Sequence, residues 1–338
     1  MNKWYIEKGE QGDIVISTRI RLARNLSDYP FPGKLDAKGR QAVNELVRDA
    51  LLKDNTGGFS YLEMKNLTRS QAVSLAERHL ISPEFASAAE GRALMLTEDE
   101  SVSIMLCEED HIRLQVMKAG LALHETYAIA DQIDTVLDSR LKYAYDKRIG
   151  YLTQCPTNLG TAMRASVMLH LPALTSAGQI NRLATTVSKL GLIIRGAYGE
   201  GSSPKGDIYQ LSNQITLGIT EKGALDNLQS ITLQLVNQER EAAKMMMSNP
   251  GENDKIWRSL GILKSARLIS CDEFMELISM VRLGASTGLI KVSLEQLNEL
   301  IVNMQPATIN AREGKSLTSI ERDTIRAATV REALKNIG

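Results

Sequence analysis

Cysteine is rare in this sequence. Cys107, Cys155 and Cys271 lie far apart, and none of them belongs to a CxxC pair. An odd number of widely spaced cysteines excludes a disulfide framework and fits a reducing, cytoplasmic environment. The four histidines show no spacing typical of metal ligands, so no metal site made of protein side chains is expected.

Long apolar runs and net charge are lacking as well. No stretch of about 18 apolar residues could cross a bilayer, and the first residues lack the apolar core of a signal peptide. Because 40 basic residues balance 40 acidic ones, direct binding to a membrane or to nucleic acid is not expected. The length of 338 residues predicts a globular protein with two domains.

The first ordered pattern is a strand over residues 13–22, where apolar and polar residues alternate. Arg19 and Arg21 share one face of this strand, and the other face carries Ile14, Ile16, Thr18, Ile20 and Leu22. Two guanidinium groups on a rigid strand suit phosphate oxygens. A solvated strand face is the alternative.

Further elements are expected from periodicity and turn signals. Helices are predicted at 38–52, 68–79, 120–141, 179–190 and 220–247, and strands at 93–96 and 102–107. In the segment after the second strand, Glu109, His111 and Arg113 would point the same way on an extended chain, pairing a carboxylate with a phosphate clamp. An acidic hairpin turn is the alternative. At the end of the 68–79 helix, His79 fits a surface position better than a ligand.

The segment from Gly150 to Pro172 is expected to change from strand to helix. Residues 150–154 end a strand, Pro156 and Asn158 suit a turn, and 161–171 has the pattern of a helix that stops at Pro172. Such a helix start, with Cys155 at the turn and Arg164 one turn inside, would suit an anion. A simple connection is the alternative.

A glycine-rich loop follows a buried strand near residue 192. Residues 196–206 carry Glu200 just after Arg195, and residues 207–217 alternate again. The loop is therefore predicted to be a flap between two antiparallel strands that closes over a ligand. A flexible linker is the alternative.

The last third of the chain shows only helical patterns. The break at residues 248–251 predicts a boundary between domains at 1–247 and 252–338, the second containing helices at 255–269, 272–283, 293–303 and 316–336. In the last helix Arg322 and Arg326 lie one turn apart, where a solvated face is the default interpretation.

Separated arginines, two glutamates and a turn cysteine together suggest phosphoryl transfer from a nucleotide, although the sequence has no Walker A motif. Five segments in order resemble the phosphagen (guanidino) kinase motifs: Ser17-Thr18-Arg19-Ile20-Arg21, Glu108-Glu109-Asp110-His111-Ile112-Arg113, residues 155–161, Arg164-Ala165-Ser166-Val167, and Arg195-Gly196 with Gly199-Glu200. The early position of the first motif, together with segments 19–25, 79–83 and 261–267, resembles the protein-arginine kinase branch. Residues 322–327 match that branch's RDxxRA phosphoarginine motif, which favours a binding site over the solvated face.

The resemblance implies an α+β fold, with an antiparallel sheet flanked by helices and then a small all-helical domain. It implies ATP and Mg²⁺ as cofactors, and Glu109, Glu200 and Cys155 as catalytic residues. The ATP-binding residues that it implies are Ser17, Thr18, Arg19, Ile20, Arg21, His79, Arg113, Arg164, Ala165, Ser166, Val167, Met168, Arg195, Gly196, Ala197, Tyr198, Gly199 and Glu200. It implies an allosteric phosphoarginine site at Arg322, Asp323, Arg326 and Ala327.

The activity implied is phosphorylation of exposed arginine side chains in repressors and damaged proteins, which marks them for a Clp unfoldase and protease system. An activator of the McsA type and a homodimer or larger assembly in the cytoplasm are expected. A kinase of free arginine and a phosphoarginine-binding adaptor with weak catalysis are the alternatives. Two departures from the family pattern stand out: Cys107 replaces a usual asparagine, and Met168 stands where small-molecule kinases often have histidine.

Overall fold

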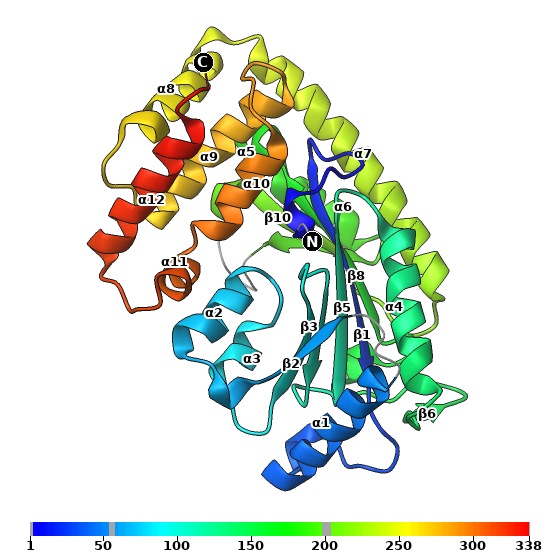
Figure 1. Cartoon of the computed structure of the whole chain (residues 1–338). Coiled ribbons are helices and arrows are strands. Elements are labelled where there is room, and N and C mark those ends of the chain that lie inside the picture. The colour runs from blue at the N-terminus through cyan, green and yellow to red at the C-terminus, as the bar shows by residue number, and fades with distance from the viewer. Residues whose placement is uncertain (1–2, 54–57, 198–203, 338) are drawn as a thin grey trace.

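An eight-stranded sheet forms the centre of the molecule (Figure 1). The computed structural model describes residues 3–53, 58–197 and 204–337. The strand order is β2-β3-β4-β5-β1-β8-β10-β9, and every neighbouring pair is antiparallel. In chain order the strands are β1 (Val15–Arg24), β2 (Phe59–Glu63), β3 (Ala93–Thr97), β4 (Val102–Leu106), β5 (Ile112–Ala119), β8 (Met163–His170), β9 (Leu192–Gly196) and β10 (Ile208–Asn213). A separate small hairpin pairs β6 (Tyr145–Asp146) with β7 (Gly150–Tyr151).

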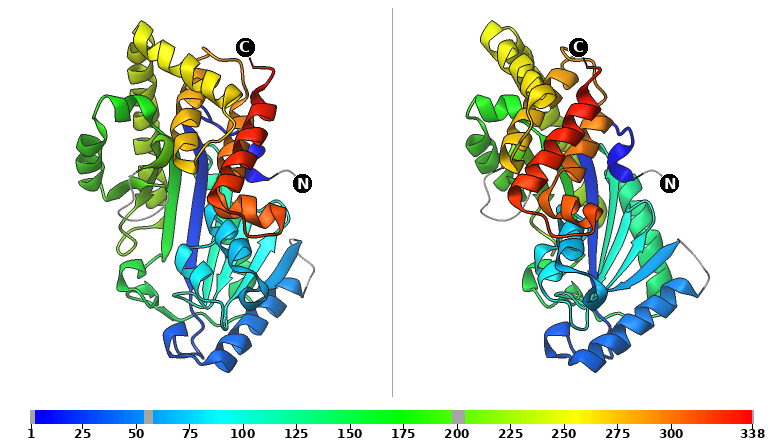
Figure 2. Two further views of the ribbon diagram at one scale, coloured as in Figure 1. Left: turned by 90° about the vertical axis from the view of Figure 1, so that its left-hand side faces the viewer. Right: turned by 60° about the vertical axis from the view of Figure 1, so that its left-hand side comes forward.

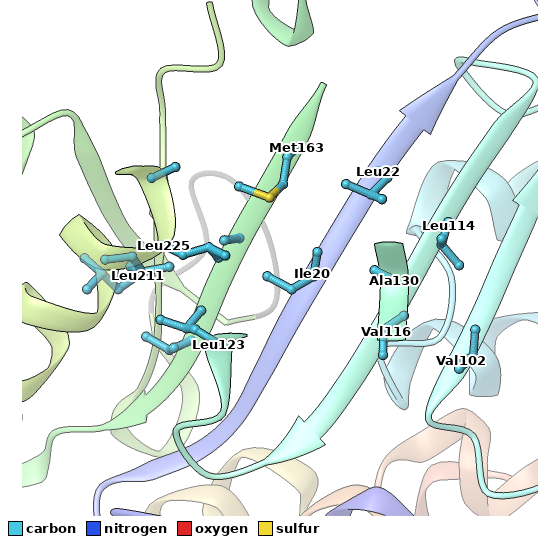
Figure 3. Close-up of a cluster of buried hydrophobic side chains, with 14 of the residues drawn as sticks. Ile20, Leu22, Val102, Leu114, Val116, Leu123, Ala130, Met163, Leu211 and Leu225 are labelled. Carbon is cyan, nitrogen blue, oxygen red and sulfur yellow. The ribbon is translucent and has the colours of Figure 1, made fainter. Parts of the chain in front are cut away.

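Helices cover both faces of the sheet. In the first part of the chain these are α1 (Ala37–Leu52), α2 (Arg69–Glu77), α3 (Pro83–Ser87), α4 (Leu123–Asp138), α5 (Pro172–Ser176), α6 (Ile180–Ser188) and α7 (Glu221–Met247). One face packs on α4 and α7 through Ile20, Leu22, Val116, Met163 and Leu225 (Figure 3). The opposite face packs on α2 and α3 near β3, β4 and β5, through Leu94, Met105 and Phe85. The antiparallel sheet flanked by helices, expected from the resemblance, is confirmed.

Strand β1 forms as its alternating pattern predicts, with one exception. Ile20 and Leu22 are buried in the main core, and Arg19 and Arg21 point to the other face. A bulge between Val15 and Ser17 interrupts the alternation. Ile16 therefore packs with the C-terminal helices instead of sharing the face of Ile20, which corrects that part of the prediction.

The helix predicted over residues 161–171 is wrong. This segment is strand β8, which lies between β1 and β10 in the middle of the sheet. A central strand is buried on both faces, so its residues do not show clean alternation, and Ala165, Met168 and Leu169 are also compatible with a helix. Pro172 starts the short helix α5 rather than ending one.

Five helices make up the C-terminal helical region: α8 (Pro250–Ser265), α9 (Cys271–Ser286), α10 (Leu294–Asn303), α11 (Pro306–Glu313) and α12 (Ser319–Leu334). The sequence predicted all but the short α11. These helices enclose a hydrophobic core of their own, which includes Phe274, Ile278 and Leu297. They lie against one end of the sheet, and α11 lies next to α2 (Figures 1 and 2). Within the described ranges, no helix combines the length and apolarity needed to span a membrane.

Candidate active site

A cavity of about 1080 Å³ lies on the face of the sheet opposite α4 and α7. Its floor is formed by side chains of β1, β5, β8 and β9, and helices α2 and α3 form a wall. The volume is at the upper end of the range for small-molecule sites, which leaves room for more than one ligand.

Arginines from neighbouring strands meet on the floor of the cavity. Arg19 and Arg21 come from β1, and the others are Arg113 of β5, Arg164 of β8 and Arg195 of β9. Arg21 and Arg164 are direct partners across the β1 and β8 ladder, so their side chains share a face. The alternation of β1 thus puts Arg19 and Arg21 on the same face of the sheet, as predicted, and this face also carries the other three arginines of the cavity.

Three guanidinium groups of this cluster, those of Arg19, Arg21 and Arg164, have lowered pKa values. Burial and the neighbouring Arg113 lower the pKa of Arg19 to about 10. Burial and the charges of Arg19, Arg113 and Arg164 hold the pKa of Arg21 well below its ordinary value, and its buried Nε has no hydrogen-bond partner among the described residues. Burial and Arg195 also lower the pKa of Arg164. Crowded guanidinium groups with an unused donor fit a polyanion such as the triphosphate of ATP.

Glu108 holds Arg113 in place. Its carboxylate accepts hydrogen bonds from Arg113 Nη1 and from the Ser82 hydroxyl of the α3 N-cap. Burial alone would lower the pKa of Arg113, but the Glu108 carboxylate more than compensates, so the pKa lies above its ordinary value. The sequence analysis missed this role, although Glu108 stands in the same acidic segment as Glu109.

Glu109 lines the cavity beside the arginines. Burial, and next the charge of Asp110, raise the pKa of its carboxyl, which makes Glu109 a stronger base than an exposed glutamate. Asp110 is buried and accepts hydrogen bonds from Asn25 Nδ2 at 2.6 Å and from the Gln154 backbone at 2.8 Å. Asp110 thereby links the segment of Glu109 to the segment of Cys155.

The shared face predicted for Glu109, His111 and Arg113 is wrong for the histidine. Residues 107–111 form a turn, with Cys107 at a φ of 56°, and β5 starts only at Ile112. His111 is fully buried, accepting from the Leu26 backbone at 3.0 Å and lying 2.9 Å from the Pro30 carbonyl. It serves the packing of this turn, whereas Glu109 and Arg113 line the cavity.

Cys155 lies at the rim of the cavity, just before the short 3-10 helix η4 (Pro156–Asn158). Its Sγ is 3.0 Å from the Thr157 hydroxyl. The Thr216 hydroxyl fixes the turn by donating to the carbonyls of Thr157 and Leu159, at 3.0 and 2.8 Å. Since β8 follows in place of the predicted helix, an anion site at a helix start is excluded here. Arg164 supplies the positive charge instead.

His79 is a wall residue of the cavity, so the interpretation as a surface histidine is wrong. Burial and the nearby charge of Arg19 lower the pKa of the imidazole to about 3, which keeps it neutral. Its backbone has a φ of 61°, a left-handed conformation that a residue with a Cβ rarely adopts. A neutral imidazole on a strained backbone, placed in a cationic cavity, points to a role in binding.

The other residues implied for ATP binding fall into three groups. The side chains of Ser17, Ser166 and Met168 line a small pocket beside Arg19, and Gly196 and Ala197 line the large cavity. Thr18 Oγ1 donates to the Gly120 carbonyl, and Ile20, Ala165 and Val167 are buried in the core on the opposite face, so these side chains point away from the cavity. Tyr198, Gly199 and Glu200 lie outside the described residues. Their loop joins β9 and β10, which pair antiparallel as predicted.

The residues of the implied phosphoarginine site lie on α12. Arg322 donates to the Leu317 carbonyl at 2.6 Å and to the Ser319 hydroxyl at 3.2 Å. Asp323 pairs with Arg326 at 2.6 Å, and both Arg326 and Ala327 are buried. Arg322 and Asp323 are thus the two of the four that reach solvent in part.

In the described ranges, no three His, Cys, Asp or Glu side chains lie close enough together to bind a metal ion.

Gln210, which the sequence analysis did not single out, also belongs to the site. Its amide oxygen accepts a hydrogen bond from Arg19 Nη2. Alternation along β10 would have been the available signal, since Gln210 and Ser212 both line the cavity.

Comparisons with known proteins agree with this geometry. Residues 42–242 match the model of the ATP:guanido phosphotransferase C-terminal catalytic domain, and residues 252–338 match the model of the protein-arginine kinase McsB C-terminal domain. The protein-arginine kinase of Halothermothrix orenii is 43% identical over 337 residues, covering 99% of this chain and 97% of that protein. That of Caldanaerobacter subterraneus is 44% identical over 323 residues, covering 94% and 96%.

Solved structures share the fold. The duplicated taurocyamine kinase from Schistosoma mansoni, with bound components of a transition state analog, has a TM-score of 0.60 and 28% identity, covering 68% of this chain and 33% of that one. Lombricine kinase has a TM-score of 0.59 and 24% identity, covering 68% and 67%. With relatives above 40% identity along nearly its full length and an arginine-lined cavity on this fold, the chain belongs to the protein-arginine kinase family and is a kinase of the ATP:guanido phosphotransferase type.

Proposed function

We propose that this kinase transfers the γ-phosphoryl group of ATP to arginine side chains of proteins. The observation that carries the proposal is the meeting of five arginine side chains next to Glu109 in one cavity, where crowding and burial lower the pKa of Arg19, Arg21 and Arg164 and favour a polyanion as ligand. Arg19, Arg21, Arg113, Arg164 and Arg195 hold the phosphates and stabilise the charge of the phosphoryl group in transfer. Mg²⁺, supplied with the nucleotide, would neutralise part of the phosphate charge beside these arginines.

The acceptor guanidinium is a poor nucleophile while it is protonated, and its pKa lies above about 12, so its nitrogen must give up a proton in the course of attacking phosphorus. Glu109 takes this proton as the new N–P bond forms and the bond from phosphorus to the ADP oxygen breaks. Its raised pKa suits the role of base. Glu200 is assigned to align the planar guanidinium, and Cys155 is assigned to tune its electronics through the sulfur atom and to be reactive toward oxidants.

The proposed division of the chain places catalysis in residues 1–247 and a regulatory site in residues 252–338. At that site Arg322 binds the phosphate of a phosphoarginine and Asp323 its guanidinium, with Arg326 and Ala327 supporting them from the core. Free phosphoarginine is expected to change the activity of the wild type but not that of an Arg322→Ala, Asp323→Ala variant. An equal response in both would remove the site from the proposal.

The cellular role proposed follows the resemblance alone. The substrates are stress-response repressors and damaged proteins with exposed arginines, which are delivered to a Clp unfoldase and protease system in the cytoplasm. In this role the kinase works with an activator of the McsA type and forms a homodimer or larger assembly. Mass spectrometry of phosphoarginine sites in cells with and without this chain tests the role, and an unchanged set of sites would refute it.

The central experiment compares Glu109→Gln with wild type, using Mg-ATP and a protein substrate. Loss of the base should lower the rate of acid-labile, alkali-stable phosphate labelling by roughly 10²- to 10⁴-fold. Glu98→Gln, at an exposed hairpin turn, is the matched control and should label as wild type does. Labelling at the wild-type rate by Glu109→Gln would refute the assignment of the base.

Two alternatives predict different outcomes of the same assay. A small-molecule kinase would consume ATP with free L-arginine and leave proteins unlabelled. A phosphoarginine-binding adaptor would keep its main activity when Glu109 is replaced but lose it when Arg322 and Asp323 are replaced.

A further inference from the structure

Helix α2 ends at the cavity in an unusual way. The backbone N–H groups of His79 and Leu80 donate to the carbonyls of Ala76 and Leu75, both at 2.9 Å, which is the Schellman arrangement. His79 occupies the left-handed position that glycine usually takes in this motif, with a φ of 61°. The end of α2 therefore sets where the imidazole stands in the cavity, and the strain requires that this end be held firmly.

Glu77, two residues before His79, fastens this end to the C-terminal helical region. Its carboxylate accepts hydrogen bonds from the Ala307 backbone at 2.9 Å, the Thr308 backbone at 2.7 Å and the Thr308 hydroxyl at 2.9 Å. These N–H groups belong to the first turn of α11. A carboxylate in the last turn of α2 opposes the dipole of its own helix, and the N-terminus of α11 offsets that cost. Ser74 adds a bond to the Thr308 hydroxyl at 3.2 Å.

The start of α11 is held from its other side by α12. Arg326, which is 1% exposed, donates to the Met304 carbonyl at 2.9 Å and to the Ile269 carbonyl at 2.8 Å. The same guanidinium pairs with Asp323. Met304 lies two residues before α11, so this helix start is fixed between Arg326 on one side and Glu77 on the other.

We infer that Glu77 is a positioning residue for nucleotide binding: it transmits the position of α11 and α12 to His79 and so sets the affinity of the cavity for ATP. The inference rests on the proposed function, in which His79 contacts ATP. Glu77 itself also borders the cavity, but its carboxylate oxygens are engaged by α11. Its effect therefore passes through the helix end and not through direct contact with the phosphates.

A double-mutant cycle in the full-length kinase tests this coupling, with the KM for ATP and kcat measured at saturating protein substrate. Glu77→Gln replaces an acceptor oxygen with an NH₂ group that faces the N–H groups of α11, and should raise the KM for ATP roughly 3- to 10-fold with kcat little changed. His79→Ala should raise it as well. In the double variant the KM for ATP should rise no further than in His79→Ala, because both substitutions act through the same imidazole.

The controls separate the possible failures. Glu313→Gln, at the other end of α11, should leave both constants unchanged. If Glu77→Gln does not fold, Thr308→Val removes only the hydroxyl contacts and should raise the KM in the same direction, by less. An unchanged KM in His79→Ala would refute the proposed place of ATP and this inference with it. Increases that multiply in the double variant would refute the inference alone.

Discussion

Replacing Arg19 with methionine should make the free protein more stable while removing its response to ATP. The pKa of Arg19 falls from 12.5 to about 10, which corresponds to a penalty of about 3 kcal/mol on the charged side chain in the fold. The penalty is fully present at neutral pH, because the folded protein gives up this proton only as the pH rises through about 10. Methionine fills a similar volume without the charge.

The loss of the hydrogen bond to Gln210 offsets part of this gain. Gln210 borders the cavity, so water can replace the guanidinium, and losing this bond to a charged group costs about 1.5 kcal/mol. The net stabilisation is therefore about 1.5 kcal/mol, or a urea midpoint higher by roughly 0.5 M, since the m-value of a chain of this length is about 3 kcal/mol/M or more. Saturating ATP should stabilise the wild type by about 3 kcal/mol at 100 times its Kd but leave Arg19→Met almost unchanged.

Urea unfolding followed by tryptophan fluorescence measures both effects. The chain has two tryptophans, and a Trp257→Phe background leaves Trp4, which is buried in the cluster with α2 and α3, as the reporter. Arg258→Met, at an exposed arginine of α8, is the control and should shift the midpoint very little. A midpoint of Arg19→Met at or below that of wild type, or an undiminished response to ATP, would refute this account of the arginine cluster.

Three further predictions use the same protein. His79→Gly should relieve the strain of the left-handed backbone and raise the free energy of unfolding by about 1 kcal/mol, while the KM for ATP also rises. Thermal melts and steady-state kinetics measure the two effects, and a fall in stability would contradict the prediction. Burial raises the pKa of Glu239 to about 7, so the folded state keeps a proton that the unfolded state loses above about 4.5. Stability should therefore fall by about 3 kcal/mol between pH 4.5 and 7 and should do so less in Glu239→Gln, which urea titrations across this range can check. Gly160→Ala would bring a Cβ within 2.3 Å of the Thr216 carbonyl and should displace the turn of Cys155, lowering kcat. Gly178→Ala, also at a positive φ but with open space around the new Cβ, should not lower kcat.

Local periodicity predicted much of the fold. The alternation of residues 13–22 placed Arg19 and Arg21 on one face of β1, and the long helix α7 and the break after it were expected from their sequences. Periodicity failed where tertiary position decides the conformation. Residues 163–170 became a strand because they lie between β1 and β10, a contact that no local pattern encodes.

The site was predicted from the motifs more than from the spacing. Spacing alone placed His111 on the same face as Glu109. The left-handed turn at Cys107 breaks the alternation of the chain there, and it leaves no clear signal in the sequence. Gln210 was missed because it holds an arginine from a distant segment, a pairing that depends on the register between β1, β8 and β10. Glu108 was missed although Arg113 is only five residues away, because the alternation of an extended chain puts the two side chains on opposite faces and the turn at residues 107–111 removes that alternation.

The position of β1 in the sheet also bears on how the chain folds during synthesis. Strands β2, β3, β4, β5 and β1 can pair once residue 119 has left the ribosome, but the other neighbour of β1 is complete only at residue 170. At about 5–20 residues per second, β1 remains an open edge strand for roughly 3–10 s. Arg19, Arg21 and Arg24 lie along that edge, and edge strands that carry positive charge resist pairing with other chains. Arg19 and Arg21, which are proposed to hold ATP in the finished kinase, would thus first protect the nascent protein from aggregation.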